Sequence, residues 1–529
     1  MSAELPILET LLDLLGADTI AATMERRAAT DPAHVYCWFD GEAYSYGAVN
    51  GAANCLANAL LGSGLKPGDR VALMLPSHPD HVIALAALMK AGLIRVPVNA
   101  HYKGAALLQV FDQFTPHALI ADAAFAAPLE PVLQGPHAPR MVFWRGGTGE
   151  FDRMRDGGDD RPPPVRTVPD DILAFTPSSG TTGASKGVLK SDRTLRAGPV
   201  GIRVLTGLKP GDVFLLWEPL HHGAGVAVAI AALLWPITLA MVERFSASRF
   251  WDDVRRYSVT HIHYLGGVLP LLLKQPPGPE DRNHKVRVAW GGGCPPDVWQ
   301  EFARRFGVAM REGYGLSEMI TFVTVNTEGH EGSIGRALAF FDVRLGDDTG
   351  EPVAVGQTGE IMVRARTRGL EFLGYYENPQ ASRATMRGQW CCTGDLARAD
   401  EAGRLYFAGR KKDVIRRRGV NIAAWEVERV IATHEDVQEC ALVGVPSELG
   451  EEDLKLFVRI ATGRTLDPLA LVKWCEPRLP YFQVPRYIAF VDEFPKTPTQ
   501  RIRKGELSRT VDCWDLEKSG HVLDRGRVA

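Results

Sequence analysis

Residues 172–187 read ILAFTPSSGTTGASKG, an apolar run that passes into a loop rich in serine, threonine and glycine. We expect Ile172–Thr176 to form a strand, because short apolar runs bounded by turn residues are typical of buried strands. Ligands of α/β sheets gather at the carboxyl ends of parallel strands. The stretch therefore predicts an α/β fold with a ligand site directly after this strand.

The loop Ser178–Gly187 has the composition of a phosphate-binding loop. Its glycines allow tight turns that present backbone N–H groups to an anion. Its hydroxyl groups add donors without adding charge, and Lys186 adds a mobile positive charge. The Walker order G-x-x-x-x-G-K-[ST] is absent. A flexible surface linker is the alternative, because Gly/Ser-rich segments are common in linkers.

Strand patterns alternate with helix patterns through about the first 400 residues. The expected strands include Arg70–Leu75, Leu93–Val98, His261–Leu265 and Val308–Arg311, and the expected helices include His81–Ala91, Phe250–Tyr257 and Pro296–Phe306. This βαβ order predicts parallel-rich sheets with helices on their faces.

The pattern changes toward the end of the chain. From Glu360 onward the expected strands are shorter and more polar, and a basic run at 410–419 leads into an amphipathic helix, Ala424–Thr433. We expect a large N-terminal α/β region of parallel-rich sheets, residues 1–411, and a small C-terminal α/β domain, residues 412–529. The tail after Leu507 is expected to be poorly ordered or docked.

The charge balance argues against nucleic acid as a partner. The net charge is −3, so no global field attracts polyanions. Residues 410–418 contain six basic side chains, which is typical of a solvated basic face or an RNA patch. Aromatic residues that could stack on bases are not interleaved with them. We therefore expect no nucleic acid partner.

The cysteines and the termini predict a cytoplasmic protein. None of the 8 cysteines forms a C-x-x-C pair, which suits free thiols in a reducing compartment. Glu4, Glu9 and Asp13 interrupt the apolar residues at the N-terminus, so we expect no signal peptide there. The final residues, GRVA, match no peroxisomal or ER address.

The stretch Gly223–Val242 contains no charged residue and has the length of a bilayer span. Pro236 interrupts it, which favours a buried helix ending near Leu234 followed by a core strand, Ile237–Val242. We therefore expect no membrane span.

Five segments, taken in order, resemble the signature motifs of the adenylate-forming superfamily, which comprises acyl-CoA synthetases, peptide-synthetase adenylation domains and luciferases. The segments are Ser178–Gly187, Tyr314-Gly315-Leu316-Ser317-Glu318, Thr393-Gly394-Asp395, Gly409-Arg410-Lys411-Lys412-Asp413 and Pro495-Lys496-Thr497. They cover the chain from about residue 20 to about residue 510. Within the superfamily, Phe250–Arg287 is most similar to carnitine/crotonobetaine–CoA ligases.

The resemblance implies an enzyme that activates a small carboxylic acid with ATP and Mg²⁺ and transfers it to coenzyme A. A carboxylate is a poor electrophile, and an acyl-adenylate gives it a good leaving group. The alternatives are transfer to a carrier protein or an amine, and a non-catalytic nucleotide or acyl-CoA binding protein; a luciferase-like oxygenase ranks below these. The sequence is compatible with a homodimer. The sequence does not identify the acid.

The resemblance also implies the roles of individual residues. Binding of ATP or AMP is implied for Ser178, Ser179, Gly180, Thr181, Thr182, Gly183, Gly291, Gly292, Gly293, Tyr314, Gly315, Asp395 and Arg410. Catalytic roles are implied for Lys186, His222, Ser317, Glu318, Arg501 and Lys504, with Glu318 as the Mg²⁺ contact. Lys412 is the implied hinge of a mobile C-terminal domain. Contacts with CoA or the acyl group are implied for Arg416, Gly419, Asn421, Trp217, Tyr264 and Gly267.

The resemblance fails at one important position. The family segment has the form Pro-Lys-Thr-x-x-Gly-Lys, but here Gln500 stands in place of the glycine and Arg501 in place of the lysine. Arg501 keeps the positive charge and is the replacement we favour, although its planar group is not an equivalent point charge. Lys504 reaching in, or a slow or specialised enzyme, are the other hypotheses.

Candidate residues of the acyl pocket are Trp217, His222, Tyr264, Gly266, Gly267, Trp290 and Thr321. No carboxylate among them would pair with a quaternary ammonium group, although the aromatic rings could hold one. His222 resembles the acyl-pocket histidine of the family. A zinc site formed by His221, His222, His261 and His263 is the competing hypothesis, but no further ligand completes it.

Overall fold

The computed structural model describes residues 18–146, 149–178, 186–265, 267–417, 420–447, 452–496 and 501–523. The chain divides into two compact units. Among the described residues, the larger unit comprises those within Met1–Gly180, Ala184–Asp342 and Val363–Cys391, and the smaller those within Val343–Met362 and Cys392–Ala529. Both contain sheets and helices, so the predicted α/β fold class is confirmed.

The described part of the larger unit contains a nine-stranded sheet in the order β15-β14-β13-β12-β11-β9-β10-β1-β2. These strands are β15 (Arg336–Ala337), β14 (Thr324–Asn326), β13 (Ala309–Tyr314), β12 (Val288–Gly292), β11 (His261–Leu265), β9 (Val213–Leu216), β10 (Thr238–Met241), β1 (Val35–Phe39) and β2 (Glu42–Ser45). The central strands from β13 to β1 pair in parallel, as the βαβ order predicts.

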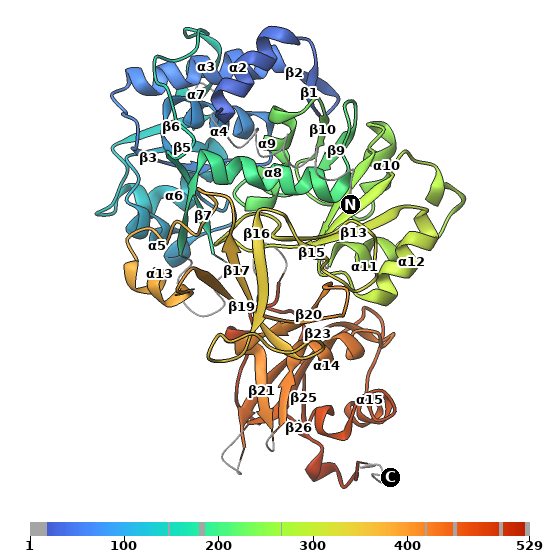
Figure 1. The fold of residues 1–529 in the computed structure, drawn as a ribbon. Coiled ribbons are helices and arrows are strands. Elements are labelled where there is room, and N and C mark those ends of the chain that lie inside the picture. The colour runs from blue at the N-terminus through green and yellow to red at the C-terminus, as the bar shows by residue number, and fades with distance from the viewer. Residues whose placement is uncertain are drawn as a thin grey trace. The chain divides into compact units, whose positions relative to one another are not determined.

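The two faces of this sheet carry different side chains. Ile262 and Tyr264 of β11 pack into an apolar core with helices α10 (Phe250–Arg256), α11 (Val268–Leu273) and α12 (Pro296–Phe306), which lie together against the sheet (Figure 1). His261 and His263 alternate with them and contact Phe214 and Trp290 instead. One strand therefore supplies apolar side chains to the core and polar ones to the opposite face.

A six-stranded sheet of the larger unit has the order β6-β5-β3-β4-β7-β8. Its strands are β6 (Met141–Arg145), β5 (Ala118–Asp122), β3 (Arg70–Met74), β4 (Ile94–Pro97), β7 (Ile172–Pro177) and β8 (Gly187–Ser191). The strand expected at Ile172–Thr176 is confirmed as β7. It runs parallel to β4, and β8 returns antiparallel to it, so the predicted phosphate loop connects the strands of a hairpin.

The helices of the larger unit are α2 (Ile20–Thr30), α3 (Tyr46–Gly62), α4 (Pro79–Ala91), α5 (Gly104–Phe114), α6 (Ala126–Leu133), α7 (Glu150–Asp156), α8 (Asp192–Thr206), α9 (Gly223–Leu234) and α13 (Pro379–Thr385), besides α10 to α12. The helices expected at His81–Ala91, Phe250–Tyr257 and Pro296–Phe306 are confirmed as α4, α10 and α12. Pro79 begins α4, and Gly92, in the left-handed region, ends it.

The uncharged stretch Gly223–Val242 forms helix α9 and strand β10, as predicted from Pro236. Most of the side chains of α9 are buried in the protein core. Among the residues that the structure describes, no helix combines the length and the apolar character needed to cross a bilayer.

The remaining sheets are formed by residues between 341 and 515. One has the order β16-β17-β19-β18, with β20 beside β19, another pairs β21 with β22, and the third has the order β23-β24-β25-β26. Their strands are β16 (Phe341–Gly346), β17 (Thr358–Ala365), β18 (Met386–Arg387), β19 (Trp390–Ala399), β20 (Leu405–Arg410), β21 (Val414–Arg417), β22 (Val420–Ala423), β23 (Val437–Pro446), β24 (Glu452–Ile460), β25 (Tyr487–Phe490) and β26 (Trp514–Asp515).

The smaller unit has its own apolar core. Helices α14 (Ala424–Ile431) and α15 (Pro468–Cys475) pack on it through side chains such as Val427 and Leu471. Strand β26 pairs with β25, and Asp515 forms an ion pair with Arg486 at 3.2 Å. The described part of the tail after Leu507 is therefore docked on its own unit, which was one of the two forms expected.

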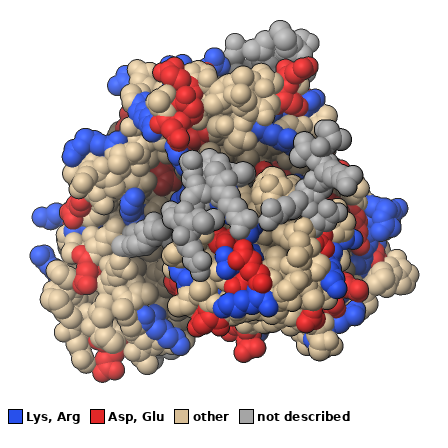
Figure 2. All heavy atoms as spheres, turned by 90° about the horizontal axis from the view of Figure 1, so that it is seen from below, with Lys and Arg blue, Asp and Glu red and all other residues tan. Residues whose placement is uncertain are grey.

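Acidic and basic side chains are interspersed on the face of the molecule shown in Figure 2. This mixture agrees with the small net charge of −3.

Candidate active site

The base of the predicted phosphate loop is closed by backbone and side-chain hydrogen bonds. The Ser178 N–H donates to the Lys186 carbonyl at 2.8 Å, and the Lys186 N–H donates to the Ser178 hydroxyl at 3.1 Å. The predicted contacts Ser179, Gly180, Thr181, Thr182 and Gly183 lie outside the described residues. The two ends of the loop are therefore held together at the edge of the β7–β8 hairpin.

The segment Tyr314–Glu318 reaches the base of this loop. The Ser317 hydroxyl donates a hydrogen bond to the Pro177 carbonyl at 3.2 Å. The half-buried Glu318 carboxylate accepts a hydrogen bond from the Tyr375 hydroxyl at 2.7 Å, and the Lys186 ammonium lies 4.8 Å from the centre of the Tyr375 ring. The structure thus brings together the predicted residues Lys186, Ser317 and Glu318.

Tyr375 was not among the residues predicted from the sequence. It lies in the segment Gly374-Tyr375-Tyr376, between apolar and turn residues, and this pattern is typical of a strand without a role in binding. The one available signal was a pair of adjacent tyrosines before a helix start at Asn378-Pro379.

The donor set fits a magnesium ion that enters with a nucleotide. No group of three or more His, Cys, Asp or Glu side chains within the described ranges could hold a metal ion. Mg²⁺ usually retains several waters and takes only one or two protein carboxylates together with substrate phosphates. Glu318, at the base of the phosphate loop, is such a single carboxylate.

The four histidines of the zinc hypothesis do not form a cluster. His261 lies 3.8 Å from the Asp212 carboxylate and stacks on Phe214, while His263 contacts Glu218. His222 caps helix α9 instead, with its Nδ1 accepting a hydrogen bond from the Ala224 N–H at 3.5 Å.

The glycine turn 291–293 is anchored by a buried carboxyl group. Glu312 of β13 accepts hydrogen bonds from the N–H groups of Gly293 at 2.7 Å and Cys294 at 3.3 Å. Burial raises the pKa of Glu312 to about 8, although these two bonds oppose the shift. A side chain at Gly291 would collide with the Tyr264 carbonyl, so the close approach of the two strands requires glycine there.

Tyr314 and Gly315 lie at the end of β13, the strand that pairs with β12 beside this turn. Tyr314 ends strand β13 and is 8% exposed, and its carbonyl accepts a hydrogen bond from the Val323 N–H at 2.7 Å. A side chain at Gly315 would collide with the Thr321 carbonyl. The backbone around the predicted adenine contact is therefore fixed by close packing.

The predicted acyl-pocket residues differ in how deeply they are buried. Tyr264 lies in the core beneath α10 to α12 and donates to the Arg311 carbonyl at 2.9 Å. Trp217 is half-buried, and its indole N–H donates to the His263 carbonyl at 2.9 Å. Gly267 precedes helix α11, and Gly266 lies outside the described residues.

Sequence reasoning missed a buried carboxylate beside these residues. Glu218 follows Trp217 and contacts His263, whose ring lies 4.2 Å from that of Trp290. Glu218 is 1% exposed, and burial lowers the pKa of His263. The first turn of α9 lies over this pair, because Gly225 approaches the backbone of Glu218 closely. The alternation of side chains along β11 would have placed His263 on the face of the sheet opposite Tyr264. Nothing in the local sequence marks Glu218 as its partner.

The smaller unit pairs two other predicted residues. Asp395 of β19 and Arg410 of β20 face each other in register, and their side chains form an ion pair at 3.3 Å. The neighbouring Glu360 accepts a hydrogen bond from the Gly394 N–H at 2.9 Å and pairs with Lys411 at 3.2 Å. A carboxylate and a guanidinium are therefore held side by side at one edge of this sheet.

The remaining predicted residues of the hinge region are only partly described. Lys412 is exposed within a short 3₁₀ turn, Lys411–Asp413. Gly419 and the side chains of Arg416 and Asn421 lie outside the described part of the chain.

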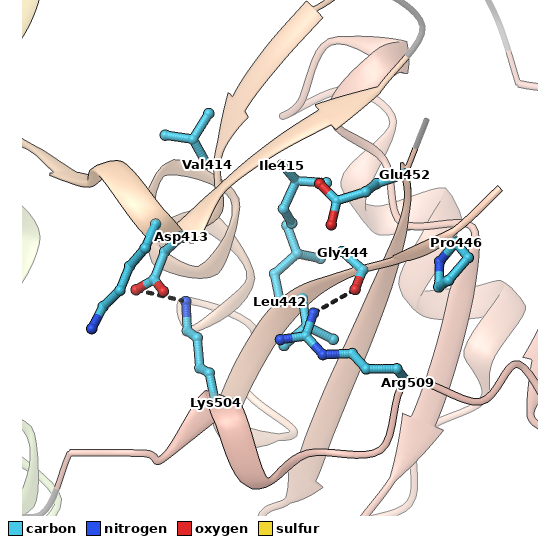
Figure 3. Close-up of a pocket in the computed structure, with 11 residues that line it drawn as sticks. Asp413, Val414, Ile415, Leu442, Gly444, Pro446, Glu452, Lys504 and Arg509 are labelled. Carbon is cyan, nitrogen blue, oxygen red and sulfur yellow. Dashed lines mark hydrogen bonds and ion pairs between the residues drawn. The ribbon is translucent and has the colours of Figure 1, made fainter. Parts of the chain in front are cut away.

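Lys504 and Arg501 lie in different surroundings. The Lys504 ammonium pairs with Glu428 at 2.7 Å and lies 3.9 Å from Asp413. It borders a pocket of about 350 Å³ whose lining includes Lys412, Glu452 and Arg509 (Figure 3). Arg501 is exposed, one residue before an isolated bridge between Lys496 and Ile502. Lys504 is thus engaged within its own unit.

Comparisons with known proteins identify the family of the chain. A family model described as AMP-binding enzyme matches residues 24–376, and a model described as AMP-binding enzyme C-terminal domain matches residues 426–501. The chain belongs to the AMP-binding enzyme family. The resemblance of its motifs to the adenylate-forming superfamily is thereby confirmed.

Individual relatives are CoA ligases. A crotonobetaine/carnitine–CoA ligase of Escherichia coli O157:H7 is 29% identical over 485 residues, covering 88% of this chain and 93% of the relative. A benzoate CoA ligase from Burkholderia xenovorans LB400 superposes with a TM-score of 0.84 at 23% identity, covering 93% of this chain and 100% of that chain. The o-succinylbenzoate CoA synthetase of Bacillus subtilis, solved with ATP and magnesium, gives 0.82 at 22% identity, covering 92% and 98%.

Replacing Glu312 by Gln should change how stability depends on pH. The folded protein holds a proton on Glu312 up to about pH 8, whereas the unfolded chain releases it near the ordinary value of 4.5. The parent therefore loses stability as pH rises through this window, by up to about 1.4 kcal/mol per pH unit, and Glu312→Gln does not share this loss. Thermal unfolding at several pH values between 5 and 8 measures the difference.

The exposed Glu301 of α12 provides the control, because Glu301→Gln should retain the parent's pH profile. Parallel profiles for the parent and Glu312→Gln would contradict the prediction.

Replacing Lys504 by Ala should destabilise the smaller unit. The half-buried Glu428 would lose its ammonium partner, at a cost of about 1 to 3 kcal/mol. Arg503→Ala removes an exposed ion pair with Glu506 and should cost less than about 0.5 kcal/mol. Thermal unfolding of the three proteins tests this, and equal midpoints for Lys504→Ala and the parent would disprove it.

Proposed function

We propose that this chain is an ATP-dependent carboxylic acid–CoA ligase that acts through an acyl-adenylate. The observation that carries the proposal is the placement of Ser317 and Glu318 at the base of the phosphate loop, beside Lys186, in a member of the AMP-binding enzyme family. A hydroxyl, a carboxylate and an ammonium group at one loop are suited to binding a nucleoside triphosphate and its metal ion.

The reaction has two balanced steps. The carboxylate oxygen of the acid attacks the α-phosphorus of ATP, and the bond to the β-phosphate oxygen breaks, giving acyl-AMP and pyrophosphate. The thiol of CoA then attacks the acyl carbon, loses its proton, and displaces AMP to form the thioester. The first step turns a resonance-stabilised anion into a mixed anhydride with a good leaving group.

The residues of the larger unit serve the first step. Lys186 offers a positive charge to the phosphates, and the Ser317 hydroxyl is available to the α-phosphate. Glu318 would hold Mg²⁺, which supplies charge neutralisation on the phosphates when bound. Tyr314 would offer a flat face to adenine, with Gly291, Gly292, Gly293 and Gly315 leaving room for its close approach.

Two residues of the smaller unit are the ribose contacts that we propose. The Asp395 carboxylate has two oxygens to accept hydrogen bonds from the ribose hydroxyls, and Arg410 provides a second contact. We infer that residues 412–529 act as a mobile domain with Lys412 as its hinge, which presents Arg501 during adenylation. We also propose that CoA is contacted by Arg416, Gly419 and Asn421.

The class of acid follows from the relatives and from the candidate pocket residues. The Escherichia coli relative quoted above is named for crotonobetaine and carnitine, which makes a small acid the class that we propose. His222, Trp217 and Gly267 remain candidates for the acyl pocket, whereas the core position of Tyr264 argues for a supporting role. The eight cysteines, all within the described residues, form no disulfide with one another, which supports a reducing compartment such as the cytoplasm. A homodimer is compatible with this function but is not required by it.

A product assay tests the proposed function. The purified chain is incubated with ATP, Mg²⁺, CoA and one acid at a time, including carnitine, crotonobetaine, benzoate, anthranilate and o-succinylbenzoate. At least one acid should give stoichiometric AMP and acyl-CoA, detected by liquid chromatography and mass spectrometry. Pyrophosphate exchange without a CoA product would favour a carrier-protein or amine acceptor, and ATP binding without exchange for any acid would favour a binding protein.

Arg501→Ala should lower acyl-adenylate formation far more than Lys504→Ala. Loss of one charged contact to the reacting phosphate is expected to cost about 10²- to 10³-fold in ATP–pyrophosphate exchange. Lys504 already pairs with Glu428, so its removal should act mainly through stability. Exchange rates are compared well below the unfolding midpoint of each variant. Equal exchange by Arg501→Ala and the parent would refute the role of Arg501.

A further inference from the structure

The segment Gly374–Tyr376 lies beside strand β8, which leaves the phosphate loop. The Leu189 N–H donates to the Gly374 carbonyl at 3.0 Å, and the Tyr376 N–H donates to the Gly187 carbonyl at 2.8 Å. Val188 and Tyr375 form an antiparallel bridge between these bonds. Backbone pairing therefore places Tyr375 opposite Val188, two residues along the strand from Lys186.

Tyr375 contacts two groups of opposite charge. Its hydroxyl donates to the Glu318 carboxylate at 2.7 Å, and the Lys186 ammonium lies 4.8 Å from the centre of its ring. A hydrogen bond to a carboxylate and a cation over an aromatic face are both attractive. Lys186 and Glu318 thus contact the tyrosine rather than each other.

The tyrosine is itself held in place. Its N–H donates to the Ser382 hydroxyl at 2.9 Å, its ring lies 5.0 Å from that of Phe372, and its side chain is largely buried at 7% exposure. The buried Lys190 ammonium donates to the carbonyl of Met319, the residue after Glu318. Both the carboxylate and the backbone beside it are therefore fixed by buried partners, as a precise ligand geometry requires.

We propose that Tyr375 is a positioning residue for adenylation, which keeps the Lys186 ammonium and the Glu318 carboxylate apart and correctly oriented. This inference rests on the proposed function, in which the ammonium meets phosphate and the carboxylate meets Mg²⁺. Without the tyrosine, the two side chains are free to form an ion pair with each other. Such a pair would neutralise both groups before the nucleotide arrives.

Two substitutions separate the contributions of the ring and the hydroxyl. Tyr375→Phe keeps the ring beneath Lys186 and removes the donor to Glu318, so it should weaken metal binding while leaving metal-free ATP affinity close to that of the parent. Tyr375→Leu removes both contacts and should weaken metal-free ATP binding as well. The loss of a hydrogen bond to a charged group corresponds to about 10- to 100-fold in affinity.

The experiment measures binding as well as activity. Mn²⁺ replaces Mg²⁺, and its affinity for the ATP-loaded protein is read by electron paramagnetic resonance. ATP affinity without metal is measured by calorimetry, and ATP–pyrophosphate exchange is titrated with Mg²⁺. For Tyr375→Phe we expect a Mn²⁺ affinity at least about tenfold weaker, an equal rise in the Mg²⁺ concentration that half-saturates exchange, and an unchanged rate of thioester formation from preformed acyl-adenylate and CoA.

Tyr376→Phe is the matched control. Tyr376 is the next residue along the chain, and its ring lies 4.7 Å from that of Phe175. It should behave as the parent in every assay, and thermal unfolding monitors the fold of all variants.

Parental Mn²⁺ affinity in Tyr375→Phe would overturn the inference. Equal losses in both half-reactions together with a lower unfolding midpoint would overturn it too, because they would show a general structural role. A parent that binds Mn²⁺ with ATP but forms no thioester would refute the CoA ligase function alone, since the binding comparison tests Tyr375 without any acid.

Discussion

Backbone pairing on both sides of strand β8 is the constraint on which the candidate site depends. One edge of β8 pairs with β7 and the other with Gly374–Tyr376, so the two ends of the phosphate loop and Tyr375 share one register. Buried N–H and C=O groups must find partners, and this requirement fixes the backbone before any side chain acts. The hydrogen bond from Ser317 to the Pro177 carbonyl then ties the Tyr314–Glu318 segment to the same point.

Much of the fold and part of the site could be predicted from local sequence. The apolar run 172–176 marks β7, Pro236 separates α9 from β10, and ordered motifs locate Ser317, Glu318, Asp395 and Arg410. These signals are carried by neighbouring residues, whose periodicity and turn chemistry are readable. The antiparallel return of β8 was not predicted, because a strand's partner depends on tertiary contacts rather than on its own pattern.

The residues that could not be predicted act across long separations. Glu312 anchors the turn at Gly293, Glu218 contacts His263, and Glu428 pairs with Lys504. Each of these carboxylates reads in the sequence as an ordinary acidic residue, since only burial and a distant partner give it a role. The same applies to Lys504, which the motif presented as an alternative to Arg501 in catalysis, whereas the structure pairs it with Glu428.

The smaller unit is assembled from stretches of chain that are far apart in sequence, Val343–Met362 and residues from Cys392 onward. Strand β17 begins in the first stretch and pairs with β19, most of which lies in the second. No single crossover in a gene could therefore exchange the smaller unit alone. A cut near residue 400 would leave part of its sheet behind, and a cut before residue 343 would also carry Val363–Cys391 of the larger unit. Recombination between relatives would succeed only where residues 343–362 travel with the C-terminal piece, or where both parents carry interchangeable versions of that stretch.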